Sequence, residues 1–246
     1  MGFKVPKTFQ ITKYPQHLDF SHSDCVIKPL DLCDSHGVYL IKDGKNIKTG
    51  DLINKKQIIN DLQKIRSNIG DEYYMHDKMY DGLVPYTGYI VEELLLDENN
   101  DVPCDYKCYL FGGKIYFIGI TYNRKVVKSV QSFDSIWLTR DWKPVKQKML
   151  KNGYKFKKTI KKPECYEKMI KLVENLGKKL KRHCRIDIYI IKNEVYLGEL
   201  TFFCGAILHT FYCNLILGYL WLKNPDDYEY LDDKLKDLVP DYYNKP

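Results

Sequence analysis

Short apolar segments separated by turn residues recur along most of the chain, and this pattern is typical of antiparallel sheets. The predicted strands are residues 25–30, 38–41, 88–96, 106–111, 114–121, 184–191 and 194–200. Asp43-Gly44, Gly112-Gly113 and Lys192-Asn193 each follow such a segment and predict tight hairpin turns. We therefore expect strands that pair largely with their neighbours along the chain.

Helical spacing of apolar positions marks other stretches. Residues 54–68 repeat apolar side chains every three to four positions behind a capping residue, Asn54. Residues 163–182 carry the clearest apolar stripe in the chain, with lysines gathered at the C-terminal end. Residues 211–222 are apolar on all sides, which predicts a buried helix. We also expect a short amphipathic helix after residue 225.

Two stretches lack a clear period: the first 20 residues are polar, and residues 123–162 are basic. The order of strands and helices predicts an α+β fold with two lobes, each built on an antiparallel sheet. We expect an N-terminal extension at residues 1–20, a small lobe at 21–90, a large lobe at 91–222 and a C-terminal tail at 223–246.

Composition narrows the classes of function. The chain has 246 residues, 44% of them hydrophobic and 29% charged, which excludes wholesale disorder. The net charge of +7 favours an anionic ligand, whereas nucleic acid is disfavoured because the sequence pI of 8.8 is below the value of about 9 typical of nucleic-acid-binding domains. No apolar stretch is long enough for a membrane span, and no secretory signal is visible. We therefore expect a cytoplasmic protein, in the host cytoplasm if it is viral, with free thiols.

Polar residues on the last predicted hairpin are the main candidates for chemistry. Arg185 and Asp187 stand two positions apart on one strand, so their side chains point to the same face. Glu199 and Thr201 stand in the same relation near the end of the paired strand. Carboxylates on an apolar hairpin need a partner, because burial without one is costly. That partner is either Mg²⁺ or, through an ion pair, Arg185 itself.

Other charged residues interrupt apolar strands nearer the N-terminus. Glu92 and Glu93 either end a strand in solvent or hold the amine of a nucleobase. Lys28 stands alone in an apolar strand just before the loop Ser35-His36-Gly37. It either extends to solvent or binds a phosphate that the loop N–H groups cover.

These features, taken in order, resemble the ATP-grasp superfamily, and within it the TupA-like group associated with polysaccharide and teichuronopeptide synthesis. The resemblance covers about residues 18–212. The matching motifs are Val26-Ile27-Lys28, Asp34-Ser35-His36-Gly37, Val91-Glu92-Glu93, Asp105-Tyr106-Lys107, Arg185-Ile186-Asp187 and Gly198-Glu199-Leu200-Thr201-Phe202. Each motif is short, but their order and spacing together are fairly specific.

The resemblance implies that ATP lies between the two lobes. It implies ATP-binding roles for Lys28, Ser35, His36, Gly37, Glu92, Glu93, Leu95, Asp105 and Lys107. Among these, Lys28 and Lys107 would contact phosphates and Asp105 a ribose hydroxyl, whereas the adenine would lie against Glu92, Glu93 and the backbone near Leu95. Mg²⁺ would be bound by Asp187, Glu199 and Thr201, and Arg185 would stabilise the transferring phosphoryl group.

The activity implied is an ATP- and Mg²⁺-dependent ligase that joins a carboxylate to an amine through an acyl phosphate in glycan biosynthesis. A phosphotransferase on the same scaffold, or a nucleotide-binding remnant without turnover, are the alternatives. The altered segment Phe202-Phe203-Cys204-Gly205-Ala206 and the short stretch before Lys28 favour the remnant. The sequence leaves the identity of the acid, the amine and the oligomeric state open.

Overall fold

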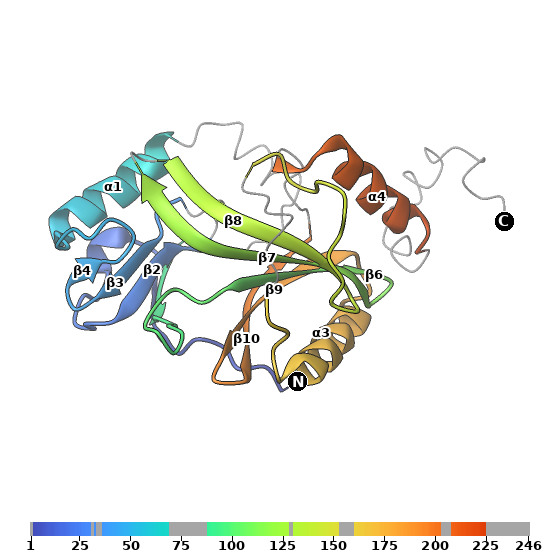
Figure 1. The fold of residues 1–246 in the computed structure, drawn as a ribbon. Helices are drawn as coiled ribbons and strands as arrows, with labels where there is room; N and C mark the ends of the chain where they lie inside the picture. Colours follow the sequence, from blue (N-terminus) through green and yellow to red (C-terminus); the bar gives the residue numbers. More distant parts are fainter. Residues whose placement is uncertain are drawn as a thin grey trace. The chain divides into compact units, whose positions relative to one another are not determined.

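The fold is taken from a computed structural model of the chain. The structure describes residues 2–30, 32, 36–68, 88–127, 130–152, 160–202 and 208–224. The chain divides into an N-terminal unit, Pro6–Leu95, and a C-terminal unit formed by Met1–Val5 together with Leu96–Pro246. Both units are built on an antiparallel five-stranded sheet, so the α+β class expected from the sequence is confirmed (Figure 1).

The sheet of the N-terminal unit has the order β1-β5-β2-β3-β4. Its strands are β1 (Thr8–Thr12), β2 (Cys25–Pro29), β3 (Tyr39–Lys42), β4 (Lys45–Asn46) and β5 (Tyr89–Glu93). A 3-10 turn, η1 (Pro15–His17), follows β1, and helix α1 (Lys55–Asn68) follows β4. The predicted cap of α1 is confirmed, since Asn54 Oδ1 accepts a hydrogen bond of 3.2 Å from the backbone N–H of Gln57.

Alternation along β2 and β5 divides this sheet into two faces. Cys25 and Ile27 of β2 lie in the core of the unit with Val91 of β5, where α1 adds Ile58 and Leu62. Successive strand residues point to opposite faces, so Lys28 and Glu92 share the face opposite this core. The two charged positions are therefore brought together by the same alternation that builds the core.

The sheet of the C-terminal unit has the order β10-β9-β6-β7-β8. Its strands are β6 (Asp105–Phe111), β7 (Lys114–Val127), β8 (Val130–Thr139), β9 (Cys184–Ile191) and β10 (Glu194–Thr201). Helix α3 (Tyr166–Leu180) precedes β9, and helix α4 (Phe211–Leu222) follows β10 (Figure 1).

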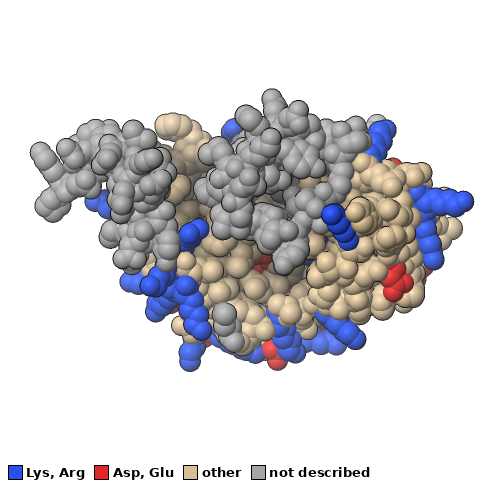
Figure 2. Space-filling view, turned by 180° about the vertical axis from the view of Figure 1, so that it is seen from behind, with Lys and Arg blue, Asp and Glu red and all other residues tan. Residues whose placement is uncertain are grey.

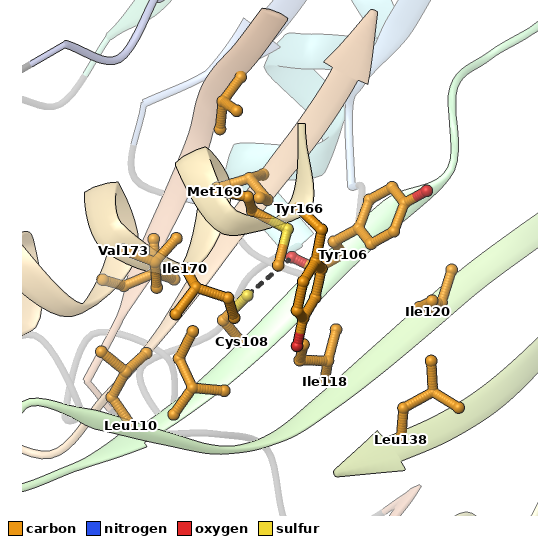
Figure 3. Packing of buried hydrophobic residues seen from close by; sticks show 14 of the residues in the cluster. Tyr106, Cys108, Leu110, Ile118, Ile120, Leu138, Tyr166, Met169, Ile170 and Val173 are labelled. Carbon is orange, nitrogen blue, oxygen red and sulfur yellow. Dashed lines mark hydrogen bonds between the residues drawn. The ribbon is translucent and has the colours of Figure 1, made fainter. Parts of the chain in front are cut away.

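One face of this sheet packs against α3 and forms the largest core of the protein. Met169 and Val173 of α3 lie against Cys108 of β6 and Ile118 of β7, all fully buried (Figure 3). On β6 the even-numbered residues point to this face, so Asp105, Lys107 and Tyr109 point to the other. Helix α3 thus fixes which side of the sheet carries the polar residues.

The opposite face carries an aromatic cluster at the end of the sheet that α4 covers. Trp137 of β8 is almost fully buried, and its ring lies 4.6 Å from that of Tyr109, measured between centroids. Cys213 of α4 is buried in the same cluster, and Ile216 and Leu217 pack against it. This half of the face is apolar, whereas the half around Lys107 is charged.

A bulge in β10 sets the direction of its last side chains. Leu197 pairs with Ile188 and faces α3, but the register shifts between Leu197 and Glu199, so that Glu199 pairs with Asp187. Without the extra residue, Gly198, the side chain of Glu199 would point toward α3. A side chain at position 198 has little room, since a Cβ there would lie 2.7 Å from the Tyr189 ring.

Several expectations from the sequence are wrong in detail. Residues 8–12 form β1 although the first 20 residues looked irregular, because pairing with β5 supplies the hydrogen bonds. Residues 123–127 continue β7 and residues 130–139 form β8, in place of the irregular segment expected there. Helix α4 does form, but its outer face is exposed and not buried. The helix expected after residue 225 lies outside the described residues.

Helix α3 begins at Tyr166 and ends at Leu180, within the predicted range of 163–182. Across the described parts of the chain, no helix is both long and apolar enough to cross a bilayer.

Candidate functional site

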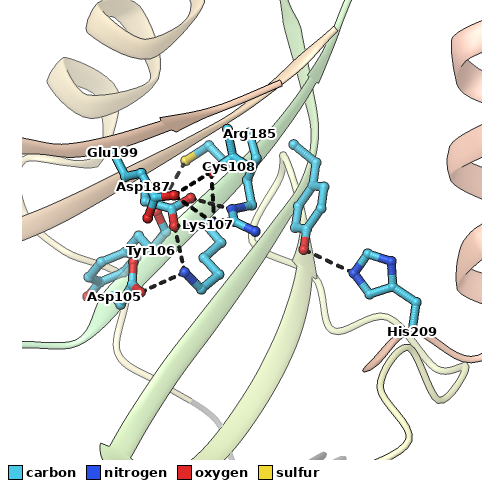
Figure 4. A network of polar contacts seen from close by, with 10 residues as sticks. Asp105, Tyr106, Lys107, Cys108, Arg185, Asp187, Glu199 and His209 are labelled. Carbon is cyan, nitrogen blue, oxygen red and sulfur yellow. Dashed lines mark hydrogen bonds and ion pairs between the residues drawn. The ribbon is translucent and has the colours of Figure 1, made fainter. Parts of the chain in front are cut away.

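Charged residues on three adjacent strands meet on the face of the C-terminal sheet that lies away from α3 (Figure 4). Lys107 of β6 pairs in register with Asp187 of β9, which pairs in turn with Glu199 of β10. Side chains at directly opposed positions lie close enough to interact across strands. The sheet therefore places a cation between carboxylates in one row, which we call the polar row.

Asp187 is the centre of the polar row. Its Oδ1 accepts a hydrogen bond of 2.6 Å from Arg185 Nε, and its Oδ2 accepts one of 2.8 Å from Arg185 Nη2. The same Oδ2 lies 2.5 Å from Lys107 Nζ. The Asp187 side chain is only 3% exposed, so its charge is compensated by these two cations and not by water.

Lys107 joins a second buried carboxylate to the row. Its Nζ lies 2.7 Å from Asp105 Oδ2 as well as 2.5 Å from Asp187 Oδ2. Asp105 and Lys107 stand two positions apart on β6, so one ammonium group bridges two carboxylates on the same face.

Glu199 and Thr201 lie at the exposed edge of the row. The Thr201 hydroxyl donates to Glu199 Oε1 at 3.0 Å and accepts from Arg185 Nη2, also at 3.0 Å. The Glu199 side chain is 60% exposed, and its Oε1 lies 3.9 Å from Arg185 Nη2. The ion-pair interpretation of Arg185 is therefore realised with Asp187, while Glu199 faces solvent.

The oxygen donors of the row suit Mg²⁺, which takes one or two carboxylates together with phosphate oxygens and water. Asp187 and Glu199 are opposed on neighbouring strands, and Thr201 adds a hydroxyl beside them. Among the described residues there is no group of three or more His, Cys, Asp or Glu that could hold a metal ion. The donor set thus fits Mg²⁺ that arrives with a phosphate ligand better than Mg²⁺ held by protein alone.

The aromatic cluster borders the polar row and contains residues that sequence reasoning missed. Tyr109 follows Lys107 on the same face of β6, and its hydroxyl lies 3.4 Å from His209 Nε2 (Figure 4). Burial lowers the pKa of His209. The hydrogen bond that His209 Nδ1–H donates to Asn214 Oδ1 raises this pKa, and the positive charge of Arg185 lowers it. His209 and Tyr109 stand 100 residues apart in the sequence, so no local sequence signal could have paired them.

The thiol of Cys108, on the opposite face of β6 from the polar row, is inert. Cys108 lies between Lys107 and Tyr109 on β6 and points to the α3 face, where it is fully buried. Burial raises the pKa of the Cys108 thiol, and the negative charges of Asp187 and Asp105 raise it further. This cysteine therefore belongs to the core and takes no part in the polar row.

In the N-terminal unit, Lys28 and Glu92 form an ion pair. Lys28 Nζ lies 2.5 Å from Glu92 Oε1, with exposed side-chain fractions of 34% for the lysine and 12% for the glutamate. Both point away from the core of that unit. The lysine that looked isolated in the sequence thus has a carboxylate partner, and its amino group is reached by solvent.

Glu93 and Leu95 are placed differently from Glu92. Glu93 pairs with Cys25 and its Oε2 accepts a hydrogen bond of 3.1 Å from the backbone N–H of Lys7. Adjacent residues of a strand point to opposite faces, so Glu92 and Glu93 cannot present their carboxylates to one side. Leu95 follows the end of β5 and is half-buried.

The loop after β2 is described only in part. Ser35 lies outside the described residues, whereas His36 is exposed and Gly37 adopts a positive φ of 68°. A Cβ at Gly37 would lie 2.9 Å from Leu62 Cδ2 and 3.0 Å from Pro29 Cγ. Gly37 therefore packs closely on the end of β2 and on α1, which fixes the end of the loop beside Lys28.

A comparison with protein families finds a match to a family described as TupA-like ATPgrasp over residues 8–218. Among solved structures, the D-alanine–D-alanine ligase from Bacillus anthracis in complex with ATP is 17% identical, with a TM-score of 0.43 over 97% of this chain and 58% of that one. The corresponding ligase from Helicobacter pylori is 16% identical, with a TM-score of 0.42 over 94% of this chain and 57% of that one.

The ATP-grasp ligase PsnB complexed with a minimal precursor is a further similar structure. It is 10% identical, with a TM-score of 0.40 over 89% of this chain and 56% of that one. This chain thus spans a little over half the length of these ligases. A comparison with curated protein sequences finds no match.

Proposed function

The chain belongs to the TupA-like ATP-grasp family, and on that premise we propose that it is an ATP- and Mg²⁺-dependent ligase that joins a carboxylate to an amine. The observation that carries this proposal is the polar row. Buried Asp187 is held by two cations beside an exposed Glu199, all on one face of a rigid sheet. Phosphoryl transfer needs such fixed charges more than it needs covalent chemistry from the protein.

We assign the nucleotide contacts to residues of both units. In the C-terminal unit, Lys107 binds a phosphate and Asp105 a ribose hydroxyl. In the N-terminal unit, Lys28 binds a phosphate beneath the Ser35–Gly37 loop. The adenine lies against Glu92 and the backbone from Glu93 to Leu95, because only one of the two glutamates points to a given face.

The reaction proceeds in two steps that conserve every atom. An oxygen of the substrate carboxylate attacks the γ-phosphorus of ATP, the bond to the β–γ bridging oxygen breaks, and ADP leaves. The amine nitrogen then attacks the acyl carbon, inorganic phosphate leaves, and the amine releases a proton to solvent. Arg185 lies within reach of Asp187, Thr201 and Glu199, and it stabilises the charge on the transferring phosphoryl group.

Asp187, Glu199 and Thr201 are the residues that would hold Mg²⁺. When bound there, Mg²⁺ supplies neutralisation of charge on the phosphate oxygens. The protein's own contribution is to keep the two carboxylates opposed across β9 and β10 and to hold Arg185 next to them.

We propose that the acceptor is a glycan or a sugar-linked acid, as the sequence resemblance to the TupA-like group implies. The face of the protein in Figure 2 shows many more lysine and arginine side chains than aspartate and glutamate, in keeping with a net charge of +7. An acidic substrate would be attracted by such a surface. Free cysteines and a need for ATP fit a cytoplasmic enzyme.

The test begins with ATP and Mg²⁺, followed by a set of sugar acids with hydroxylamine as the amine. We expect ADP release that depends on the acid, and an acyl hydroxamate as product. Arg185→Gln should abolish ADP release. Arg140→Gln is the matched control, because Arg140 also binds a carboxylate, Glu174, with two nitrogens but lies outside the polar row.

Other outcomes identify the alternatives. A stable phosphorylated product without hydroxamate would show a phosphotransferase and overturn the ligase. Stabilisation of the fold by ATP and Mg²⁺ without turnover on any acid would indicate a nucleotide-binding remnant. No stabilisation at an ATP concentration of about 100 times a typical dissociation constant, where about 2.7 kcal/mol is expected, would remove the nucleotide site itself.

A further inference from the structure

The outer face of α4 is apolar and exposed. Phe211 is 83% exposed and Leu215 is 60% exposed, and they lie one helical turn apart. The large apolar side chains exposed on this helix are Phe211, Tyr212, Leu215, Tyr219, Trp221 and Leu222. Exposed apolar residues scattered singly are ordinary, but a continuous set on one helix marks an interaction surface.

The inner face of α4 already packs on the aromatic cluster, so the apolar residues of the outer face are not the ones that attach the helix to the sheet. Cys213 is fully buried, and Ile216, Leu217 and Leu220 pack on the aromatic cluster. The Thr210 hydroxyl caps the helix by accepting a hydrogen bond from Cys213 N–H at 3.2 Å. The helix is therefore anchored along one side while its other side presents aromatic and aliphatic groups.

Exposed lysines lie on the strand-like segment bonded to the start of α4 and at the end of the helix. The segment before α4 is joined to residues 148–151 by backbone bonds, from Thr210 N–H to Met149 O and from Lys151 N–H to Leu208 O. The exposed lysines within residues 143–151 and at the end of the helix are Lys143, Lys146, Lys148, Lys151 and Lys223. Within the described residues, none of these lysines forms an ion pair, and the Lys223 ammonium lies 5.7 Å from the centroid of the Tyr219 ring on the same helix.

We propose that α4 and these lysines form a docking surface for a membrane that contains anionic lipid. Tryptophan and tyrosine favour the boundary between lipid headgroups and acyl chains, and Trp221, Tyr212 and Tyr219 supply them. Lysines beside an inserted apolar helix face add attraction to anionic headgroups. Two copies of this chain meeting through α4 would bring the lysines of each copy together, which disfavours self-association.

Binding through this surface attaches the protein peripherally to the membrane. The helix lies in the plane of the membrane interface with Phe211 and Leu215 inserted. Because the bound face is not part of the polar row, attachment leaves nucleotide binding intact. The proposal therefore stands or fails independently of the proposed ligase activity.

The test is co-sedimentation of the full chain with vesicles of phosphatidylcholine alone and of phosphatidylcholine mixed equally with phosphatidylglycerol. We expect binding to the mixed vesicles that weakens with salt. Leu215→Glu should lower the partition coefficient by about tenfold or more, and Lys148→Gln with Lys151→Gln by about tenfold. Leu52→Glu is the matched control, because Leu52 is also exposed but lies in the N-terminal unit.

Each result decides the question. Binding that is unchanged in Leu215→Glu, or no binding to mixed vesicles, overturns the proposal. Equal binding to both vesicles overturns the role of the lysines and hence of anionic lipid. Sedimentation velocity of the lipid-free protein tests for a dimer. A dimer that Leu215→Glu dissociates would assign the face to a second copy. Phe211→Ser provides a second variant if Leu215→Glu unfolds in thermal melts.

Discussion

The lysine–carboxylate groups around Lys28 and Lys107 differ in how deeply they are buried and in how many partners each lysine has. In the N-terminal unit, Lys28 meets one glutamate, and its side chain is about one third exposed at 34%. In the C-terminal unit, Lys107 bridges two aspartates that are nearly buried, and Arg185 completes the coordination of Asp187. Both groups contain a lysine that is assigned to a phosphate, but only one of them is a closed network.

The difference concerns what a ligand must displace. Lys28 can turn from Glu92 toward a phosphate at small cost, because water reaches its amino group. At Asp187 both carboxylate oxygens are occupied by cations. A metal can bind Asp187 only when Lys107 or Arg185 finds a new anion, and a phosphate supplies one. The polar row is thus suited to receive the metal and the nucleotide together.

The largest effect in this comparison is expected from Asp187→Asn. The substitution keeps the size of the side chain but leaves Arg185 and Lys107 with less negative charge, so we expect a loss of stability of about 2–3 kcal/mol and no ATP binding. Denaturant unfolding and nucleotide titration measure the two effects. Glu174→Gln is the control, since it also removes a carboxylate bound by an arginine. ATP affinity equal to wild type in Asp187→Asn would contradict the assignment.

The next effect is expected from Gly198→Ala. The new Cβ would lie 2.7 Å from the Tyr189 ring and 3.3 Å from the Asp187 carbonyl oxygen, so the bulge that orients Glu199 must shift. We expect a loss of about 1–3 kcal/mol in the free energy of unfolding together with weaker Mg²⁺-dependent ATP binding. Gly218→Ala is the control in a helix with open space at the Cβ, where stability should rise by up to about 1 kcal/mol.

Lys107→Met sharpens the comparison. Removing this cation leaves Asp187 Oδ2 with the hydrogen bond from Arg185 Nη2 but without the lysine, so the affinity for Mn²⁺ without nucleotide should rise about tenfold or more, since a neighbouring unit charge is worth about 1–4 kcal/mol. Electron paramagnetic resonance of free Mn²⁺ measures this directly. Lys28→Met should leave metal affinity unchanged. Equal Mn²⁺ affinity in wild type and Lys107→Met would show that the network does not exclude the metal.

The smallest effect on stability is expected from Lys28→Ala. An ion pair reached by solvent contributes less than about 1 kcal/mol, so the melting temperature should scarcely change. ATP affinity should nevertheless fall, because the amino group is assigned to a phosphate. Calorimetric titration of the variant separates the two. A large loss of stability would mean that Lys28 belongs to a network like that of Lys107, and the comparison would fail.

Much of the fold could be predicted because alternation and turn residues are local signals. Arg185 and Asp187 share a face for this reason, and the spacing alone places them together. The extension of β7 and β8 could not be predicted, because pairing such as that of Lys125 with Ser132 depends on backbone bonds between strands. The exposed face of α4 was missed because composition reports that a helix is apolar but not what covers it.

The site was predictable only within single strands. The sequence gives no means to see that Lys107 reaches Asp187, since the two are joined through the order of β6 and β9 in the sheet. The bulge at Gly198 is equally hidden, because it depends on the neighbouring Tyr189. Tyr109 and His209 meet only through the fold. Motifs therefore identified the charged residues, whereas the sheet determined their partners.

The burial of Trp137 has an optical consequence. Its ring contacts Tyr109 in a buried cluster and lies 6.0 Å from that of His209, measured between centroids. Trp221, in contrast, stands on α4 and is 41% exposed. Indole emission shifts to longer wavelengths in water, so the buried and the exposed tryptophan have emission maxima at different wavelengths. Of the three tryptophans in the chain, Trp137 thus reports on the sheet beside the polar row and Trp221 on whatever touches α4.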